Sequence, residues 1–186
     1  MDIELLQSGF ATVLDGLLDG RKAAGDLADT PRRAAKFFAQ CLANEGVSNE
    51  ELVARYAKAF PVDYDDPVVV TGIPVFSFCE HHLALMYDMH IDAAYIPSGY
   101  VLGLSKISRL ADAAARRLQL QERLTRDVAE LIQMAVHPQA VVVRVSGKHS
   151  CVTARGIQKD SETFTEAVRG EAGLVNELRE ILKCKK

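Results

Sequence analysis

Residues 67–78 read PVVVTGIPVFSF and residues 90–96 read HIDAAYI, and these two segments decide the fold. Both are rich in β-branched and aromatic residues, which favour extended backbone on a half-buried sheet surface. Two further segments have the same character: AVVVRVS at 140–146 and CVTARGI at 151–157, joined through Gly147-Lys148-His149-Ser150. The sequence therefore predicts two strand pairs, one in the middle of the chain and one nearer its end.

Helical patterns surround these strand pairs. Apolar residues recur at helical spacing over 5–18, and Thr30-Pro31 is typical of a helix start, with Thr30 as the N-cap. A short helix is expected over 49–58 and a final one over 174–182. A long helical stretch is expected from Ser105 to about Val136, because its apolar residues fall on helical faces. This order of elements predicts an α+β domain with an antiparallel sheet.

The size and composition are those of an ordinary globular protein. The chain has 186 residues, 48% of them hydrophobic and 25% charged, so it can bury a core and is not disordered. Its apolar runs are too short to cross a bilayer, and Met1-Asp2-Ile3-Glu4 does not resemble a secretion signal. We therefore expect a cytoplasmic protein with no membrane partner. The formal net charge of −3, taken alone, argues against a polyanionic ligand.

The tetrapeptide Cys79-Glu80-His81-His82 carries the strongest chemical signal. Its cysteine and second histidine are three residues apart, a common spacing for two ligands of one metal ion, and His149-Ser150-Cys151 supplies another cysteine near a histidine. Cys79, His82 and Cys151 would fill three positions of a zinc ion and leave the fourth for water. His81 and His149 would then transfer protons near that water. The same pattern is compatible with ordinary buried strand cysteines, and a Cys151–His149 nucleophile pair ranks below a metal site.

Positive charge gathers in two segments despite the negative total. Residues 101–126 contain six cations and two anions, and residues 144–159 contain four cations and no acid. Ser105 would cap the helix that begins there, and free N–H groups and the helix dipole favour an anion at such an end. The cations expected to bind an anion are Lys106, Arg109 and Arg155. Because no aromatic residues are interleaved with them, a phosphorylated small molecule is favoured over a nucleic acid.

A series of short motifs also follows a fixed order along the chain. They are Thr30-Pro-Arg-Arg-Ala-Ala-Lys36, Cys79-Glu-His-His82, Ala94-Tyr-Ile-Pro97, Gly103-Leu-Ser-Lys-Ile-Ser-Arg109, Gln119-Leu-Gln-Glu-Arg-Leu-Thr125, His149-Ser-Cys151 and Ala154-Arg-Gly156. Each motif is weak by itself, but the ordered set closely resembles the GTP cyclohydrolase I family and covers roughly residues 30 to 160.

The resemblance implies the tunnelling fold, which has a four-stranded antiparallel sheet backed by two helices and an N-terminal helical arm. The arm is expected over residues 1–60 and the catalytic domain over residues 61–186. The resemblance also implies a homo-oligomer, in this family a decamer of two stacked pentamers. Its active sites would lie between subunits, so one chain alone should be inactive.

The resemblance assigns roles residue by residue. Zinc is expected on Cys79, His82 and Cys151, and His149 and His81 match the acid–base histidines. Glu122, assisted by Gln121, matches the group that holds the guanine edge, and a carboxylate can accept from both N1–H and the exocyclic amine. The residues expected to bind the triphosphate are Ser105, Lys106, Arg109, Arg155, Lys36 and Arg33.

The implied reaction consists of two hydrolyses and a rearrangement of GTP. Water activated by zinc attacks C8 of the purine while His149 protonates the ring nitrogen, and hydrolysis of the resulting formamide releases formate. The ribose then opens and rearranges to give 7,8-dihydroneopterin triphosphate, the first step of folate and pterin biosynthesis. No redox cofactor is needed.

Three segments depart from the family's pattern. Residues 83–93 lack its Gly-Lys turn, residues 158–162 are more acidic than its usual run, and residues 170–172 replace its Gly-x-Phe. These departures leave open a specialised paralogue that stops at the ring-opened formamidopyrimidine. Two alternatives from other classes also stay open: a non-catalytic tunnelling-fold protein that binds a purine or pterin, and a structural zinc protein.

Overall fold

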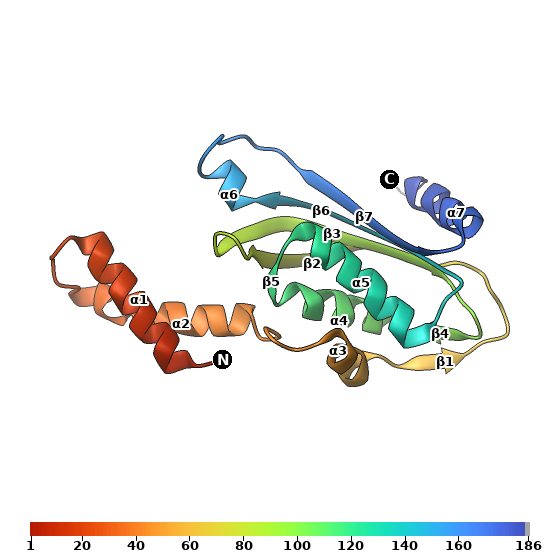
Figure 1. The fold of residues 1–186 in the computed structure, drawn as a ribbon, viewed down its shortest axis with the longest axis horizontal. Coiled ribbons are helices and arrows are strands. Elements are labelled where there is room, and N and C mark those ends of the chain that lie inside the picture. Colours follow the sequence, from red (N-terminus) through yellow and green to blue (C-terminus); the bar gives the residue numbers. More distant parts are fainter. Residues whose placement is uncertain (185–186) are drawn as a thin grey trace. The chain divides into compact units, whose positions relative to one another are not determined.

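The computed structural model describes residues 1–184. The elements, labelled in Figure 1 except for η1, are α1 (Ile3–Leu18), η1 (Gly25–Asp29), α2 (Thr30–Cys41), α3 (Asn49–Tyr56), β1 (Ala59–Pro61), β2 (Val68–Cys79), β3 (Ala84–Ile96), β4 (Tyr100–Leu102), α4 (Leu104–Ala115), β5 (Leu118–Gln119), α5 (Gln121–Val136), β6 (Ala140–His149), α6 (Ser150–Thr153), β7 (Thr163–Gly170) and α7 (Ala172–Lys183). Two compact units result, Met1–Glu45 and the segment from Gly46 onward, and each is described by itself. The functional division expected near residue 60 stays a prediction.

The first unit is a pair of helices. Helix α1 begins after Asp2, whose carboxylate accepts from the Leu5 N–H at 2.9 Å, and the Phe10 and Phe38 rings join α1 to α2 with their centroids 5.2 Å apart. The predicted N-cap of α2 is wrong by one residue: Thr30 is already helical at φ −57° and ψ −44°, and Asp29 precedes it as the cap.

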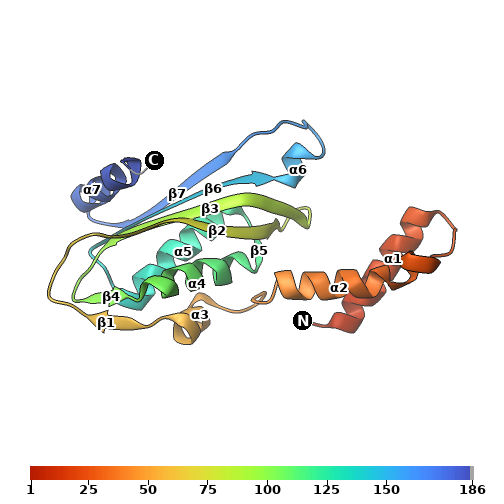
Figure 2. The same cartoon turned by 180° about the vertical axis from the view of Figure 1, so that it is seen from behind.

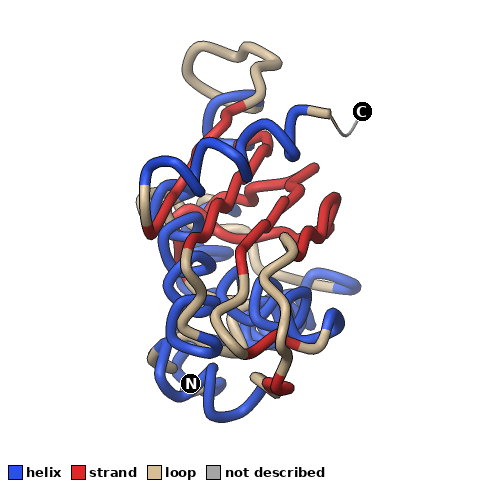
Figure 3. Tube along the Cα trace, turned by 90° about the vertical axis from the view of Figure 1, so that its right-hand side faces the viewer, coloured by secondary structure: helices blue, strands red, loops and turns tan. Residues whose placement is uncertain are grey.

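The second unit is built on a five-stranded sheet with strand order β5-β2-β3-β6-β7, and β1 and β4 form a separate two-stranded antiparallel sheet. Strands β2, β3, β6 and β7 pair antiparallel, while the two residues of β5 pair parallel with the end of β2. Helices α4 and α5 lie on one face of this sheet and α7 lies on the other (Figures 1 and 2), so that in Figure 3 the red strands lie between blue helices. The antiparallel four-stranded sheet backed by two helices is confirmed.

Strand β6 shows why this sheet needs helices on both faces. Val141, Val143 and Val145 belong to the core shared with α4 and α5, whereas Ala140 and Val142 pack against α7. Successive side chains of a strand point to opposite faces, so an unbroken run of valines fits a strand that is buried on both sides.

The strand predicted over 151–157 is wrong. Residues 150–153 instead form the short helix α6, and the partner of β6 is β7, which pairs with it from Ala140↔Gly170 to Gly147↔Thr163. The Ser150 hydroxyl donates to the Leu85 carbonyl at 2.8 Å, and the Ala154 N–H closes a helical turn on the Ser150 carbonyl at 2.9 Å. These tertiary and local hydrogen bonds override the β propensity of the segment.

The long helix predicted from Ser105 to Val136 is divided into α4 and α5. Between them, Leu118 and Gln119 pair with Phe78 and Cys79, which brings the start of α5 beside the end of β2. Gly103 is the N-cap of α4, with no side-chain cap hydrogen bond, so Ser105 is not the cap that the sequence predicted. Across the residues that the structure describes, every helix is too short or too polar to span a bilayer.

Gly170 ends β7, and we expect Gly170→Ala to destabilise the sheet strongly. Its φ is +97°, and an added Cβ would lie 2.1 Å from the Gln139 carbonyl oxygen and 2.7 Å from the Ala140 Cα. Because backbone atoms would have to move, the expected loss in the free energy of unfolding is about 2–4 kcal/mol, measured from urea unfolding curves. Gly16→Ala is the control, since nothing lies within 4 Å of the place that its methyl group would take, and helix α1 should gain up to about 1 kcal/mol. Equal unfolding midpoints for the two variants would contradict this account.

Candidate metal centre and its surroundings

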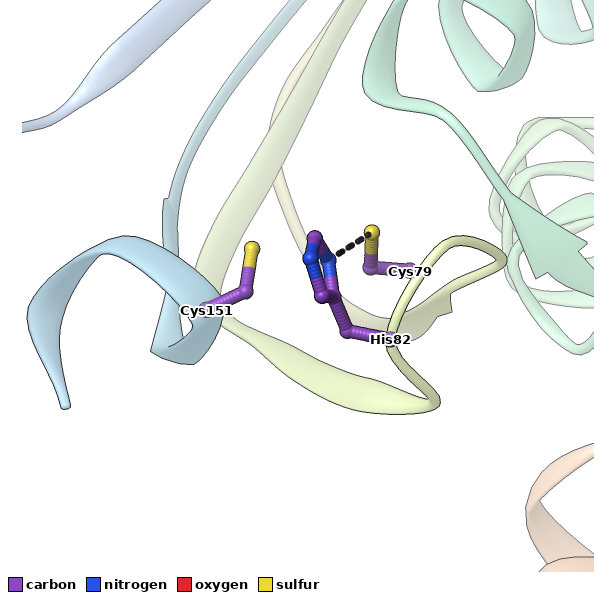
Figure 4. A group of neighbouring side chains, drawn as sticks. All are labelled: Cys79, His82 and Cys151. Atoms are coloured by element: carbon purple, nitrogen blue, oxygen red, sulfur yellow. Dashed lines mark hydrogen bonds between the residues drawn. The ribbon is translucent and has the colours of Figure 1, made fainter. Parts of the chain in front are cut away.

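Three side chains from separate elements converge at one end of the sheet. Cys79 is the last residue of β2, His82 lies in the turn between β2 and β3, and Cys151 lies in α6. Their ligand atoms all lie within 4.8 Å of one another, and the Cys79 Sγ is 3.7 Å from the His82 Nδ1 (Figure 4). The structure thus brings together the three metal ligands that the sequence predicted.

The turn that carries two of these donors is fixed by its own hydrogen bonds and by α5. The Cys79 carbonyl accepts from the N–H groups of His82 at 3.3 Å and of Leu83 at 2.9 Å, and Leu83 takes a left-handed conformation at φ +50°. The Glu80 N–H donates to the Gln119 carbonyl at 3.1 Å, and the Glu80 carboxylate forms an ion pair with Arg123 of α5. The position of the donors is therefore tied to the first turn of α5.

The donor set fits a zinc ion. Two thiols and one imidazole are ligands that zinc prefers, and three protein ligands leave a fourth position open. Burial raises the pKa of the Cys151 thiol, the neighbouring Cys79 raises it further, and the charge of Arg155 acts in the opposite direction. A bound cation would counter the repulsion between two adjacent thiolates, so metal binding and loss of the thiol protons are coupled.

A second group of side chains surrounds His149 at the end of β6. The His149 Nε2 lies 2.8 Å from the Gln121 Oε1, and Glu122 follows on the exposed side of α5. Burial lowers the pKa of His149, while the negative charge of Glu122 raises it. Three residues that the sequence predicted for the site, His149, Gln121 and Glu122, therefore lie near one another. The Gln121 side chain, however, is buried and hydrogen-bonded to protein atoms.

His81 and Arg155 lie on the segments that carry the metal donors. His81 is exposed in the β2–β3 turn, its ring perpendicular to that of His82 with the centroids 6.1 Å apart. Arg155 is exposed just after α6, near enough for its charge to act on Cys151. Both residues are thus close in sequence to a metal donor, and their roles in proton transfer and triphosphate binding stay predictions.

The predicted triphosphate residues of α4 lie elsewhere within the chain. Ser105, Lys106 and Arg109 belong to the first turns of α4, which runs from β4 to β5, and β5 is the strand that pairs with Cys79 (Figure 1). Ten residues of helix at about 1.5 Å each separate Ser105 from the far end of α4 by about 15 Å. These cations therefore lie toward the opposite end of α4 from the one that leads to the metal donors.

Arg33 and Lys36 belong to helix α2 of the first unit. Arg33 lies 3.7 Å from the Asp29 carboxylate and donates to the Asp26 carbonyl at 3.4 Å, and Lys36 is exposed. Their role in binding the triphosphate stays a prediction.

Sequence reasoning missed the part that Arg123 plays. It counted this residue among the cations of a basic segment, whereas its guanidinium binds Glu80, the Leu118 carbonyl at 2.7 Å and the Gln119 amide oxygen at 2.9 Å. The sequence signal that could have indicated this role is Glu80, which lies between the metal ligands Cys79 and His82. A carboxylate in that position needs a cationic partner, and Arg123 supplies it.

The three segments that depart from the family's pattern lie outside the cluster. Residues 83–93 form most of β3, where a register shift between Tyr87 and His90 accommodates an irregular backbone. Residues 158–162 lie in the loop before β7, where Lys148 pairs with Asp160 at 2.7 Å, and residues 170–172 join β7 to α7. Among the described residues, none of these segments contributes a donor to the cluster.

An α+β domain that places a Cys-His-Cys cluster close in sequence to a half-buried histidine, with an exposed carboxylate near that histidine, has the features of a metal-dependent hydrolase. The family model for GTP cyclohydrolase I matches residues 7–183. A protein of Clostridium botulinum (strain Loch Maree / Type A3) named GTP cyclohydrolase 1 is 39% identical over 178 residues, covering 92% of this chain and 90% of its own. One of Clostridium beijerinckii with the same name is 41% identical over 171 residues, covering 89% and 86%. The chain belongs to the GTP cyclohydrolase I family and is an enzyme.

Among solved structures, an apo archaeosine synthase QueF-Like matches with a TM-score of 0.43 and 24% identity, over 57% of this chain and 93% of that one. The sheet and backing helices described above are those of the tunnelling fold that the resemblance implied.

Proposed function

We propose that this enzyme is a zinc-dependent GTP cyclohydrolase I. It hydrolyses GTP at C8 of the purine, releases formate and yields 7,8-dihydroneopterin triphosphate, the first step of folate and pterin biosynthesis. The observation that carries the proposal is the convergence of Cys79, His82 and Cys151 next to His149, in a chain that matches the family over nearly its whole length. The cytoplasmic location stays a prediction.

Cys79, His82 and Cys151 would hold the zinc ion. When bound, the ion would act as a Lewis acid and bring the pKa of a water molecule toward about 7. The turn from Cys79 to Leu83, its ion pair with α5 and the short helix α6 hold the three donors in place. The protein's contribution is thus to bring donors from distant segments to one point.

The acid–base and recognition groups lie around the same point. Glu122 is exposed in the first turn of α5, where its carboxylate can accept from N1–H and the exocyclic amine of guanine. His149 supplies a proton to the purine ring nitrogen as the C8–N bond weakens, and His81 is a second proton-transfer group. Ser105, Lys106, Arg109 and Arg155, with Lys36 and Arg33, bind the triphosphate.

The active site is assembled between subunits of a homo-oligomer, for which a decamer is the expected form. In support of this, Ser105 and Arg109 lie toward the end of α4 that is remote from the metal donors of the same chain, an arrangement that a site shared between chains would explain. A neighbouring chain would supply the second half across a head-to-tail interface.

Mixing two inactive variants tests this assembly. His149→Asn removes the proton donor, and Arg109→Ala removes a triphosphate ligand of the other half. Coexpressed in equal amounts, the two chains should recover about a quarter of wild-type turnover, because random mixing leaves that share of sites with both halves intact. Turnover of the mixture no higher than the sum of the separate variants would place both halves of the site in one chain.

The reaction itself is tested with purified protein, GTP and zinc. After oxidation, pterin fluorescence reports the full reaction, and an independent assay reports formate. Loss of GTP without formate would identify the specialised paralogue that stops at the ring-opened formamidopyrimidine, because that product still carries the formyl group. Formate without a fluorescent product would identify a reaction that stops after formamide hydrolysis and before ring closure. Neither signal, with GTP bound but not consumed, would leave a purine-binding protein and overturn the enzymatic proposal for GTP.

A further inference from the structure

We propose that Gln121 is a positioning residue that holds His149 in one tautomer, with the proton on Nε2, and leaves Nδ1 as the atom that exchanges a proton with the substrate. The inference deepens the proposed function and rests on it for the identity of the substrate. It assigns the Gln121 side chain to the histidine, in place of the contact with guanine that the sequence pattern suggested.

The orientation of the Gln121 amide follows from its partners. The residue is 1% exposed, and its Nε2 donates to the Val145 carbonyl at 3.0 Å and to the Thr163 carbonyl at 2.9 Å. These two acceptors use both N–H groups of the amide. Turning the amide over would set its oxygen against two carbonyl oxygens, so the oxygen must point the other way.

That oxygen is the Oε1 that lies 2.8 Å from the His149 Nε2. An amide oxygen only accepts, so the His149 Nε2 must carry a proton for the two atoms to form a hydrogen bond. The neutral ring then has its lone pair on Nδ1. In the protonated ring, Nδ1–H gives its proton to the purine nitrogen and the neutral Nε2–H form remains, still bonded to Gln121.

Two threonines make additional contacts with the backbone and the side chain of Gln121. The Thr125 hydroxyl donates to the Gln121 carbonyl at 2.6 Å, and the Thr125 and Thr165 hydroxyls lie 2.6 Å apart. Since the Thr125 proton is already used, Thr165 donates in that pair and keeps lone pairs toward the Gln121 Nε2 at 3.4 Å. A network that satisfies every member is rigid, and here it joins α5 to β6 and β7.

Gln121 and Glu122, which are consecutive in α5, therefore have different roles. Gln121 faces the sheet and has its amide nitrogen and oxygen engaged by protein atoms, while Glu122 is exposed and free to meet a ligand. Loss of the Gln121 amide should allow the imidazole to rotate, and a misplaced proton donor typically costs about 10- to 100-fold in kcat.

The kinetic test uses Gln121→Met, which keeps a long unbranched side chain and removes every hydrogen bond of the Gln121 amide group. We expect kcat to fall about 10- to 100-fold, with the KM for GTP and the preference for GTP over inosine triphosphate unchanged within about twofold. Inosine triphosphate lacks the amine that a purine contact would bind, so Glu122→Gln should reduce that preference. A rise in KM or a lost preference in Gln121→Met, with kcat retained, would overturn the proposal. Thr165→Val is the matched control, because it removes only the longest contact of the Gln121 amide, at 3.4 Å, and leaves its bonds to Val145, Thr163 and His149. Its kcat should change less than about threefold.

A structural test keeps the proposal falsifiable if Gln121→Met does not fold. Neutron diffraction from crystals of the wild-type zinc-loaded protein in heavy water should show deuterium on the His149 Nε2 and both amide deuterons of Gln121 facing Val145 and Thr163. A bare Nε2, or the Gln121 nitrogen facing the ring, would refute it. This result does not depend on turnover, so inactive wild-type protein would count against the proposed function alone.

Discussion

Replacing Cys151 by serine should reduce GTP turnover by about 10³-fold or more while the sheet and helices remain. Serine is a poor zinc ligand at neutral pH because its hydroxyl keeps its proton, whereas the thiolate is the form that binds metal. Losing one of three donors weakens the binding of the metal ion. A bound metal ion contributes several kcal/mol to catalysis, and each 1.36 kcal/mol corresponds to about tenfold in rate. Zinc content measured by elemental analysis should fall together with formate release.

Cys184→Ser is the matched control for this substitution. Cys184 is exposed at the end of α7 and contributes no donor to the cluster, so zinc content and turnover should match those of the wild type. Circular dichroism of Cys151→Ser should retain the wild-type secondary structure, because α6 is a single short helix at the edge of the sheet. A Cys151→Ser protein that melts would indicate a structural zinc site, and one with full zinc and full turnover would remove Cys151 from the metal centre.

The second large effect is expected for His149→Asn, with kcat lowered about 10²- to 10⁴-fold. A positioned proton donor contributes about this much, and asparagine cannot donate an acidic proton to the purine ring nitrogen. Zinc content and the KM for GTP should change little, because His149 is neither a metal donor nor a predicted contact of the guanine edge or triphosphate.

His137→Asn controls for the loss of a histidine. His137 is exposed at the C-cap of α5 in a left-handed conformation, with φ +45°, which asparagine adopts readily. This variant should keep wild-type turnover and stability. If His149→Asn were as active as His137→Asn, the proton donor would have to be another group, and His81 is the other histidine for which the sequence predicts that role.

The sequence predicted the sheet best where the pattern is long and set by burial. The valine run of β6 and the strands β2 and β3 stand out because a half- or fully buried strand needs β-branched side chains over many residues. The short segment after His149 has the same composition but is helical, since the hydrogen bond from Ser150 to Leu85 is a contact across 65 residues. A contact at that separation leaves no trace in local composition.

The metal donors could be predicted because their chemistry restricts them to few residue types at recognisable spacing. The partners of Gln121 could not be predicted, because Val145 and Thr163 act through backbone carbonyls that every residue possesses.

The net charge of −3 was misleading as evidence against a polyanionic ligand. It sums an acidic first third of the chain with basic segments near α4 and β6, and a ligand responds to the local charge.

The most direct measurement of the central claim uses GTP isotopically labelled at C8. The wild-type protein with zinc should transfer the label to free formate, with unlabelled 7,8-dihydroneopterin triphosphate formed in equal amount, and Cys151→Ser should leave the label in GTP. Label retained in the purine by the wild-type protein, with zinc bound at the cluster, would contradict hydrolysis at C8 and with it the account given for this site.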